Sequence, residues 1–262
     1  MSAIRPIFTD TFVLAIFVAL CSTGCGQTRP ESGTTLHIAV ATNFKPAFEQ
    51  LTHLFLRQNA SVSISTHYAS SGLLYAQISN GAPYDIFLSA DRQRAQNIKK
   101  QQKTNAEIFT YAYGLLVLWA PDVEKPNFAW LRDHAGTIAI ANPNLAPYGF
   151  AARTCLDKQN VLTPTHQLVL GSSVAQTFHF VASGAAQAGI VAKSQVLDYG
   201  VPDKFYRLLP AGCYAPIQQQ VVAMDAPPEK AKTIRAFMDF LKSRAAQSLI
   251  EKAGYLPAQF DA

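Results

Sequence analysis

Four short polar stretches of this sequence have the composition of an anion-binding site. Each lies between a run of residues typical of a β-strand and a run with helical spacing: Thr42-Asn43, Ser70-Ser71-Gly72, Pro147-Tyr148-Gly149 and Ser172-Ser173-Val174. The first residues of a helix carry unpaired N–H groups and a partial positive charge. Several helix starts directed at one point would bind an oxyanion through hydroxyl, amide and backbone donors, with Lys45 as the only nearby cation.

The same residue types have a second interpretation. Ser, Thr and Asn are the preferred N-cap residues, and a single polar junction is more often a cap than a ligand. Taken singly, the four stretches indicate ordinary helix starts. Taken together, they indicate a two-lobed exported anion binder, and the residues alone leave both interpretations open.

An exported serine hydrolase is a third interpretation, with Ser70 or Ser71 as the nucleophile. Such an enzyme needs a base and an oxyanion hole in a defined relation to the serine. The stretch "YASSG" lacks the first glycine of the G-x-S-x-G motif, and none of the six histidines is placed convincingly. Asp85, in a predicted strand, and Asp91, at a predicted helix start, suit structural and capping roles. We therefore expect a binding protein and no enzyme.

The elements that would position these residues alternate between strand and helix in both halves of the chain. Strands are predicted at 36–41, 61–69, 84–90, 137–143, 166–171 and 188–192, with longer β stretches at 109–121 and 215–224. This alternation predicts parallel α/β sheets, in which ligands bind beyond the C-terminal ends of the strands. We predict two lobes, each a mostly parallel sheet flanked by helices, joined by the two long stretches as a two-strand hinge. One long C-terminal helix is expected to bury Ile234, Phe237, Leu241, Ala245 and Leu249.

The start of the chain has the pattern of an export signal. An early arginine, an apolar core at 12–20 and small residues around Cys25 define a signal over residues 1–24, too short in its core to be a membrane span. Residues 25–35 are then predicted to be a polar tether. Ser22-Thr23-Gly24-Cys25 is similar to the lipobox of bacterial lipoproteins, with serine in place of the usual leucine. Lipidation at Cys25 and plain cleavage nearby therefore both stay open.

Composition excludes several other classes. The 262 residues are 49% hydrophobic and 15% charged, which is typical of a globular protein, and the net charge of +5 has no basic cluster that would suggest nucleic acid. The scattered histidines lack the spacing of metal ligands. Cys155 and Cys213 would meet an oxidising compartment, where they could form a disulfide or remain buried thiols.

Five longer segments carry a family resemblance. "AVATNFKPAFEQL" is similar to a first strand and helix, "YASSGLLYAQISNGAPYDIFLSAD" to the most recognisable segment, and "YGLLVLWAP" to a hinge strand. "ANPNLAPYGFAA" is similar to a second-lobe anion loop, and "VAQTFHFVASGAAQAGIVAKSQV" to the segment after it. These segments resemble the molybdate-binding (ModA-type) solute-binding proteins of bacterial ABC transporters. The likeness extends over nearly all of residues 36–255.

The resemblance implies a type II periplasmic-binding-protein fold, which we divide into lobe 1 at 36–113 and 223–262 and lobe 2 at 114–222. It implies capture of molybdate or tungstate, without a cofactor, and delivery to an ABC permease in the inner membrane. We expect a periplasmic monomer, soluble or lipid-anchored at Cys25, that binds no nucleic acid. Sulfate is the main alternative ligand, because it differs mainly in size. Phosphate would recruit an acidic residue or an arginine, and neither stands at the four junctions.

Carried over position by position, the resemblance also implies the oxyanion contacts. They are Thr42, Asn43, Ser70 and Ser71 from the first lobe, and the backbone N–H groups around Tyr148 and Val174 from the second. Some members have a tyrosine directly after "GIV", where this chain has Ala192. We expect the Tyr148 hydroxyl to replace it, and the number of hydrogen bonds stays open.

Overall fold

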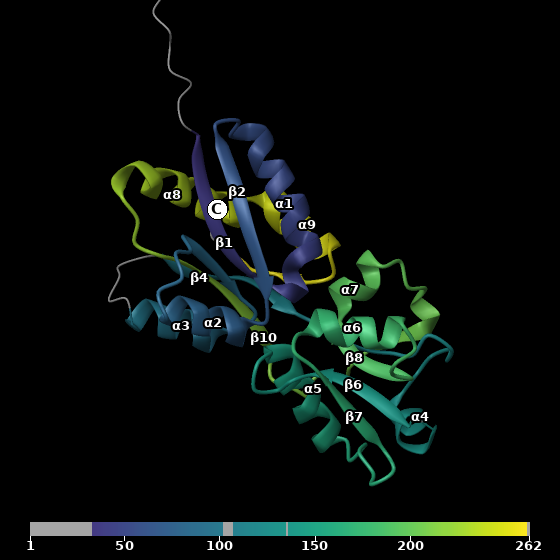
Figure 1. Ribbon diagram of the computed structural model, residues 1–262. Helices are drawn as coiled ribbons and strands as arrows, with labels where there is room; N and C mark the ends of the chain where they lie inside the picture. Colours follow the sequence, from purple (N-terminus) through teal and green to yellow (C-terminus); the bar gives the residue numbers. More distant parts are fainter. Residues whose placement is uncertain (1–32, 102–106, 135, 261–262) are drawn as a thin grey trace, which may run out of the picture. The chain divides into compact units, whose positions relative to one another are not determined.

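The computed structural model describes residues 33–101, 107–134 and 136–260, which form two β-sheets with associated helices (Figure 1). The predicted export signal and Cys25 lie outside the described residues, as does the tether up to residue 32. The last two tether residues, Thr34 and Thr35, instead begin the first strand. Within the described ranges, no helix is long and apolar enough to cross a membrane.

The first sheet has six strands among the described residues. Their spatial order is β11 (Leu256–Pro257), β4 (Ile108–Gly114), β10 (Ile217–Ala223), β3 (Ile86–Ser89), β1 (Thr34–Ala41) and β2 (Val62–Ala69). The helical elements of this part are η1 (Thr42–Phe44), α1 (Lys45–Gln58), α2 (Ser71–Ser79), α3 (Arg92–Gln101), α8 (Pro228–Lys242) and α9 (Arg244–Lys252).

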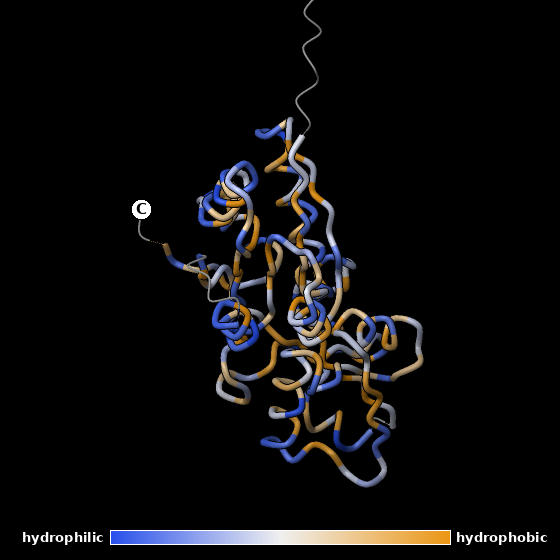
Figure 2. Tube along the Cα trace, turned by 60° about the vertical axis from the view of Figure 1, so that its left-hand side comes forward, coloured by the Kyte–Doolittle hydropathy of each residue, from blue (hydrophilic) through white to orange (hydrophobic). Residues whose placement is uncertain are grey.

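Alternation along β1 explains why helices cover both faces of this sheet. Successive side chains of a strand point to opposite faces. Ile38 packs in one core with Phe48 of α1 and Phe237 of α8, whereas Ala39 packs in another with Leu74 of α2. The helices show hydrophilic and hydrophobic residues interspersed along their length, as expected when only one face packs (Figure 2).

The second sheet has five strands in the part of the chain that the structure describes. Their order is β7 (Gln167–Gly171), β6 (Thr137–Ala141), β8 (Ala188–Ala192), β5 (Leu116–Trp119) and β9 (Tyr206–Leu208). The helical elements here are α4 (Phe128–His134), α5 (Pro147–Lys158), α6 (Val174–Ala182), α7 (Lys193–Asp198) and η2 (Asp203–Phe205). Ile140 of β6 and Leu156 of α5 belong to one core, and Val117 of β5 and Phe178 of α6 belong to the other.

The two sheets are mixed, which corrects the prediction of mostly parallel sheets. β1 is parallel to β2 and β3, and β6 is parallel to β7 and β8. The strands that carry the chain between the sheets pair antiparallel: β10 with β3 and β4, and β5 with β8 and β9. A strand that returns from the second sheet enters the first sheet at the end where β4 left it, so it runs antiparallel to β4.

The chain crosses between the sheets twice, at Leu115 between β4 and β5 and over residues 209–216 between β9 and β10. The first crossing lies within the predicted β stretch 109–121, whereas the second lies mostly before the predicted stretch 215–224. Residues 217–222, which our division placed in lobe 2, belong to β10 and therefore to the first sheet.

The C-terminal helix is broken at Ser243, so the prediction of one long helix was wrong. Ser243 has extended backbone angles, and its side chain accepts a hydrogen bond from the Ala246 N–H as the N-cap of α9. The new helix start shifts the buried face by one residue. Ala246 and Ile250 are buried, and the predicted Ala245 is exposed.

Cys155 of α5 and Cys213 of the second crossing form a disulfide, and both residues are buried. It joins positions 58 residues apart in the sequence. A cross-link of this span restricts the unfolded chain more than the folded one.

We expect the Cys155→Ala, Cys213→Ala double variant to have a free energy of unfolding lower by about 4 kcal/mol, the value for a closed loop of this length. Denaturant unfolding of wild type and variant measures the difference, and fully reduced wild type is the control. A midpoint equal to that of the oxidised wild type would contradict the stabilising role.

Candidate functional site

The four predicted junctions meet at one pocket. β1 and β2 are parallel neighbours, as are β6 and β7, so their C-terminal ends bring the following helix starts together. The described residues that line the pocket are Ala41, Thr42, Asn43, Ser70, Ser71, Ala90, Ala146, Pro147, Tyr148 and Val174. All six predicted contact residues are among these ten, and none of the ten carries a formal charge.

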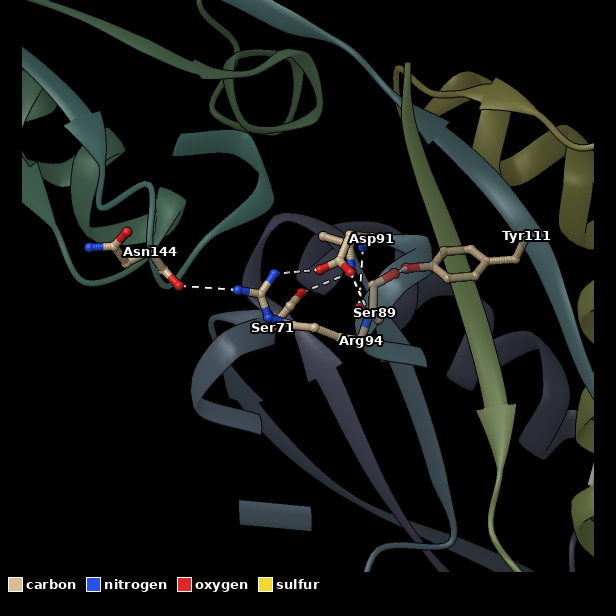
Figure 3. Close-up of polar contacts among 7 residues, drawn as sticks. Ser71, Ser89, Asp91, Arg94, Tyr111 and Asn144 are labelled. Carbon is tan, nitrogen blue, oxygen red and sulfur yellow. Dashed lines mark hydrogen bonds and ion pairs between the residues drawn. The ribbon is translucent and has the colours of Figure 1, made fainter. Parts of the chain in front are cut away.

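Ser71 begins α2 with its hydroxyl held by a backbone donor. Its Oγ accepts a hydrogen bond of 2.9 Å from the Ala90 N–H, and the side chain lies beside the start of α3 in Figure 3. A hydroxyl has one proton and can accept as well as donate. With the acceptor side used by Ala90, the Ser71 proton remains available for a further acceptor.

Ser70 precedes Ser71 at the N-cap position of α2, yet its side chain makes no cap hydrogen bond. The residue is 3% exposed, and its Oγ has no hydrogen-bond partner among the described residues. A buried polar group without a partner costs about 1–3 kcal/mol. Because Ser70 also lines the pocket, an oxyanion bound there would supply the missing acceptor.

Tyr148 lies in the first turn of α5, directly after Pro147, which suits the first helical position. The side chain is buried, and its Oη is 3.4 Å from Asn43 Nδ2 and 3.5 Å from Gln219 Nε2. Burial raises the pKa of Tyr148 well above its usual value, with the nearby Tyr255 as a further cause. The phenol therefore stays protonated and can donate.

Asn43 is more constrained than the sequence suggested. Its Nδ2 donates to Gln219 Oε1 at 2.7 Å and lies 3.3 Å from Tyr255 Oη. Its carbonyl accepts from Tyr255 Oη at 2.5 Å and from Ser194 Oγ at 3.1 Å. An amide nitrogen has two protons, so after the Gln219 bond only one remains for Tyr148, Tyr255 or a bound anion.

Sequence reasoning missed the residues behind this lining: Gln219, Tyr255, Ser194 and Tyr111. They come from β10, from the segment after α9, from α7 and from β4. Only Gln219 had a visible signal, because three consecutive glutamines interrupt an apolar β stretch. A buried glutamine in such a place needs hydrogen-bond partners.

The remaining predicted residues have simpler environments. Thr42 lines the pocket from η1, and Val174 lines it as the first residue of α6, where the N–H group has no partner within the helix. Ser173 accepts from the Gln176 N–H, which is the ordinary capping role that we left open. Ala192 lies outside the lining, and its N–H donates to Gln195 Oε1.

The lining comes from both sheets, and further hydrogen bonds besides those of Tyr148 join the two sides. The Gly72 N–H donates to the Leu145 carbonyl at 2.8 Å, and Ser194 Oγ reaches the Asn43 carbonyl. Arg94 donates to the Asn144 carbonyl at 3.1 Å, seen crossing the gap in Figure 3. At Gly72 a side chain would not fit, because a Cβ would lie 2.7 Å from the Leu145 oxygen.

The charged residues that the sequence singled out have partners of their own. Asp91 caps α3 by accepting from the Arg94 N–H at 2.7 Å and pairs with the Arg94 guanidinium at 2.8 Å (Figure 3). Asp85 accepts from the His37 N–H and pairs with Lys230. Lys45 is exposed, 3.8 Å from Glu49. The electrostatics of the pocket therefore come from hydroxyl, amide and backbone dipoles.

Comparisons with known proteins show the family of the chain. Residues 36–256 match the family described as bacterial extracellular solute-binding protein. The chain is 35% identical over 235 residues to the molybdate-binding protein ModA of Rhodobacter capsulatus, covering 88% of this chain and 92% of that protein. It is also 35% identical over 226 residues to the protein of the same name from Azotobacter vinelandii, covering 84% of this chain and 89% of that one.

Solved structures show the same architecture. The periplasmic molybdate-binding protein of Azotobacter vinelandii superposes with a TM-score of 0.79 at 36% identity, covering 86% of this chain and 100% of that one. The sulfate-binding protein SubI of Mycobacterium tuberculosis shares the fold alone, with a TM-score of 0.67 at 14% identity, over 86% of this chain and 87% of that one. The predicted two-lobed binding-protein fold is thus confirmed.

The Ser70 hydroxyl gives a prediction on stability without any ligand. Ser70→Ala removes a buried hydroxyl that has no partner, so we expect the free energy of unfolding to stay the same or to rise by about 1 kcal/mol. The matched control is Ser173→Ala, which removes a working N-cap and should cost about 1 kcal/mol. Denaturant unfolding measures both, and equal losses for the two variants would show that Ser70 is an ordinary cap.

Proposed function

The chain belongs to the family of bacterial extracellular solute-binding proteins, and we propose that it captures molybdate or tungstate and delivers it to an ABC permease in the inner membrane. The observation that carries the proposal is the buried Ser70 Oγ, which has no partner among the described residues and lines a pocket of hydrogen-bond donors. The relatives named molybdate-binding protein support the choice of anion.

The chemistry of the lining favours an anion without protons. The acceptor side of Ser71 Oγ is used by Ala90, Tyr148 Oη faces two amide nitrogens, and no carboxylate is among the ten lining residues. Molybdate, tungstate and sulfate carry no proton at neutral pH, whereas phosphate does and would need an acceptor for it. The pocket therefore disfavours phosphate, and sulfate remains the competing ligand.

The contacts of the two serines give no support to the hydrolase hypothesis. A nucleophilic serine is held by a base that takes its proton. Ser71 Oγ instead accepts from a backbone N–H, and Ser70 Oγ has no base beside it in the described structure.

We propose a carrier that acts in the periplasm as a monomer without a cofactor. Anchoring at Cys25 concerns a residue outside the described part of the chain.

Closure of the lobes follows from the placement of the donors. Ser70 and Ser71 belong to the first-sheet part, and Tyr148 and Val174 to the second. An anion gains all their hydrogen bonds only when the two parts are close together, so its affinity differs between open and closed forms. The closed form would be the one that a permease recognises.

Titration tests the choice of anion. We expect molybdate and tungstate to bind at one site per chain, more tightly than sulfate and far more tightly than phosphate, as measured by isothermal calorimetry on the mature protein. Phosphate is the internal control, because it has similar shape but carries a proton. Sulfate binding as tight as molybdate binding would leave only the general assignment to oxyanions.

Gly72→Ala tests closure. In the closed form the added Cβ would lie 2.7 Å from the Leu145 oxygen, so we expect molybdate affinity to fall at least about tenfold, equivalent to about 1.4 kcal/mol. Unfolding should become no easier, because alanine favours a helix over glycine by about 1 kcal/mol. Ser79→Ala, at the far end of the same helix, is the control. Unchanged affinity and an unchanged decrease in radius of gyration on binding would argue against the contact.

A further inference from the structure

A buried glutamine outside the pocket lining contacts two residues that line it. Gln219 of β10 is fully buried. Its Oε1 accepts from Asn43 Nδ2 at 2.7 Å and from Tyr111 Oη at 3.2 Å. Its Nε2 lies 3.5 Å from Tyr148 Oη. One side chain thus connects a first-sheet contact residue, Asn43, with a second-sheet contact residue, Tyr148.

The protons of this group can be assigned one by one. A glutamine side chain has an acceptor end and a donor end. Because Asn43 and Tyr111 both donate to Oε1, the donor end faces Tyr148. The Tyr148 oxygen then faces the N–H donor of Gln219 and lies within reach of the remaining Asn43 proton. Neither amide nitrogen can accept the phenol proton. The single phenol proton is therefore left for a third partner, either the Tyr255 hydroxyl, which lies within hydrogen-bond reach, or a ligand in the pocket that Tyr148 lines.

The backbone at Gly114 restricts the same hydroxyl from another side. Gly114 ends β4, and a Cβ placed there would overlap Tyr148 Oη and lie 3.2 Å from Gln219 Nε2. The phenol oxygen is thus packed against the backbone of Gly114, which has no side chain. Together, Gly114 and Gln219 define where the oxygen sits and which of its sides receives hydrogen bonds.

We propose that Gln219 is a positioning residue for the bound oxyanion, which acts by keeping the Tyr148 hydroxyl a donor toward the pocket. This inference rests on the proposed function and deepens it. Gln219 belongs to the first sheet and Tyr148 to α5 of the second part, so the orientation is set when the two parts are together. The consequence is that Tyr148 offers the anion a proton and never a lone pair.

Gln219→Glu is the direct test. A carboxylate keeps acceptors for Asn43 and Tyr111, but it replaces the N–H that faces Tyr148 with an oxygen that accepts the phenol proton. We expect the Kd for molybdate to rise about 10- to 100-fold, the range for losing one hydrogen bond to a charged group. Gln218→Glu is the matched control, because it adds the same charge on the neighbouring residue, whose Nε2 donates to Thr110 Oγ1 at 2.7 Å.

A double-mutant cycle separates positioning from a general effect on the fold. In the Tyr148→Phe background there is no hydroxyl to orient, so Gln219→Glu should cost no more than Gln218→Glu costs in wild type. An equal cost of Gln219→Glu in both backgrounds would overturn the inference. If Gln219→Glu does not fold, the same cycle with Gln219→Asn, a neutral amide too short to reach both partners, gives the same decision.

The outcome for wild type separates this inference from the proposed function. Wild-type protein that binds none of molybdate, tungstate and sulfate would overturn the proposed function and this inference with it. Wild-type protein that binds molybdate, with additive effects in the cycle, would overturn the inference alone. Tight binding with a cost that depends on the Tyr148 hydroxyl supports both.

Discussion

A doubly charged anion that is buried without a counter-charge needs a hydrogen-bond donor at each of its oxygens, and this requirement explains the composition of the pocket. Removing an ion from water costs many kcal/mol unless new partners replace the water molecules. In this pocket the groups available for that role are hydroxyl, amide and backbone N–H groups at helix starts, whose dipoles favour an anion. The ten lining residues contain no acid, and Asp91, next to the lining residue Ala90, is paired with Arg94.

A hydroxyl that already accepts hydrogen bonds from its neighbours is oriented to donate its proton elsewhere, and the surrounding residues supply such donors. Ala90 occupies the acceptor side of Ser71, and Gln219 and Asn43 do the same for Tyr148. Such polar networks depend on each member having its partners. The buried Ser70 hydroxyl is an exception in the described structure, and it faces the place where the anion would bind.

The parts of this design that depend on local sequence could be predicted, and those that depend on distant contacts could not. The helix starts after parallel strands follow from periodicity and capping residues, and parallel neighbours end side by side, which brings two junctions together in each sheet. All six predicted residues line one pocket. Gln219 and Tyr255 lie 176 and 212 residues from Asn43 along the chain. No local pattern specifies such pairings. The break at Ser243 was missed because a residue with ordinary helix propensity takes extended angles there, and tertiary packing decides that choice.

The disulfide bears on how the two parts can move. The first crossing between the sheets is a single residue, Leu115, and the second has eight, residues 209–216. Cys213 is bonded to Cys155 of α5. The disulfide therefore attaches the second crossing to the second-sheet part up to Cys213, and only residues 214–216 follow before β10. Two short crossings permit rotation of one part against the other but little sliding. In the proposed closure, rotation without sliding would return Gly72 to Leu145 and Gln219 to Tyr148 each time, which a site built from fixed donors on two lobes requires.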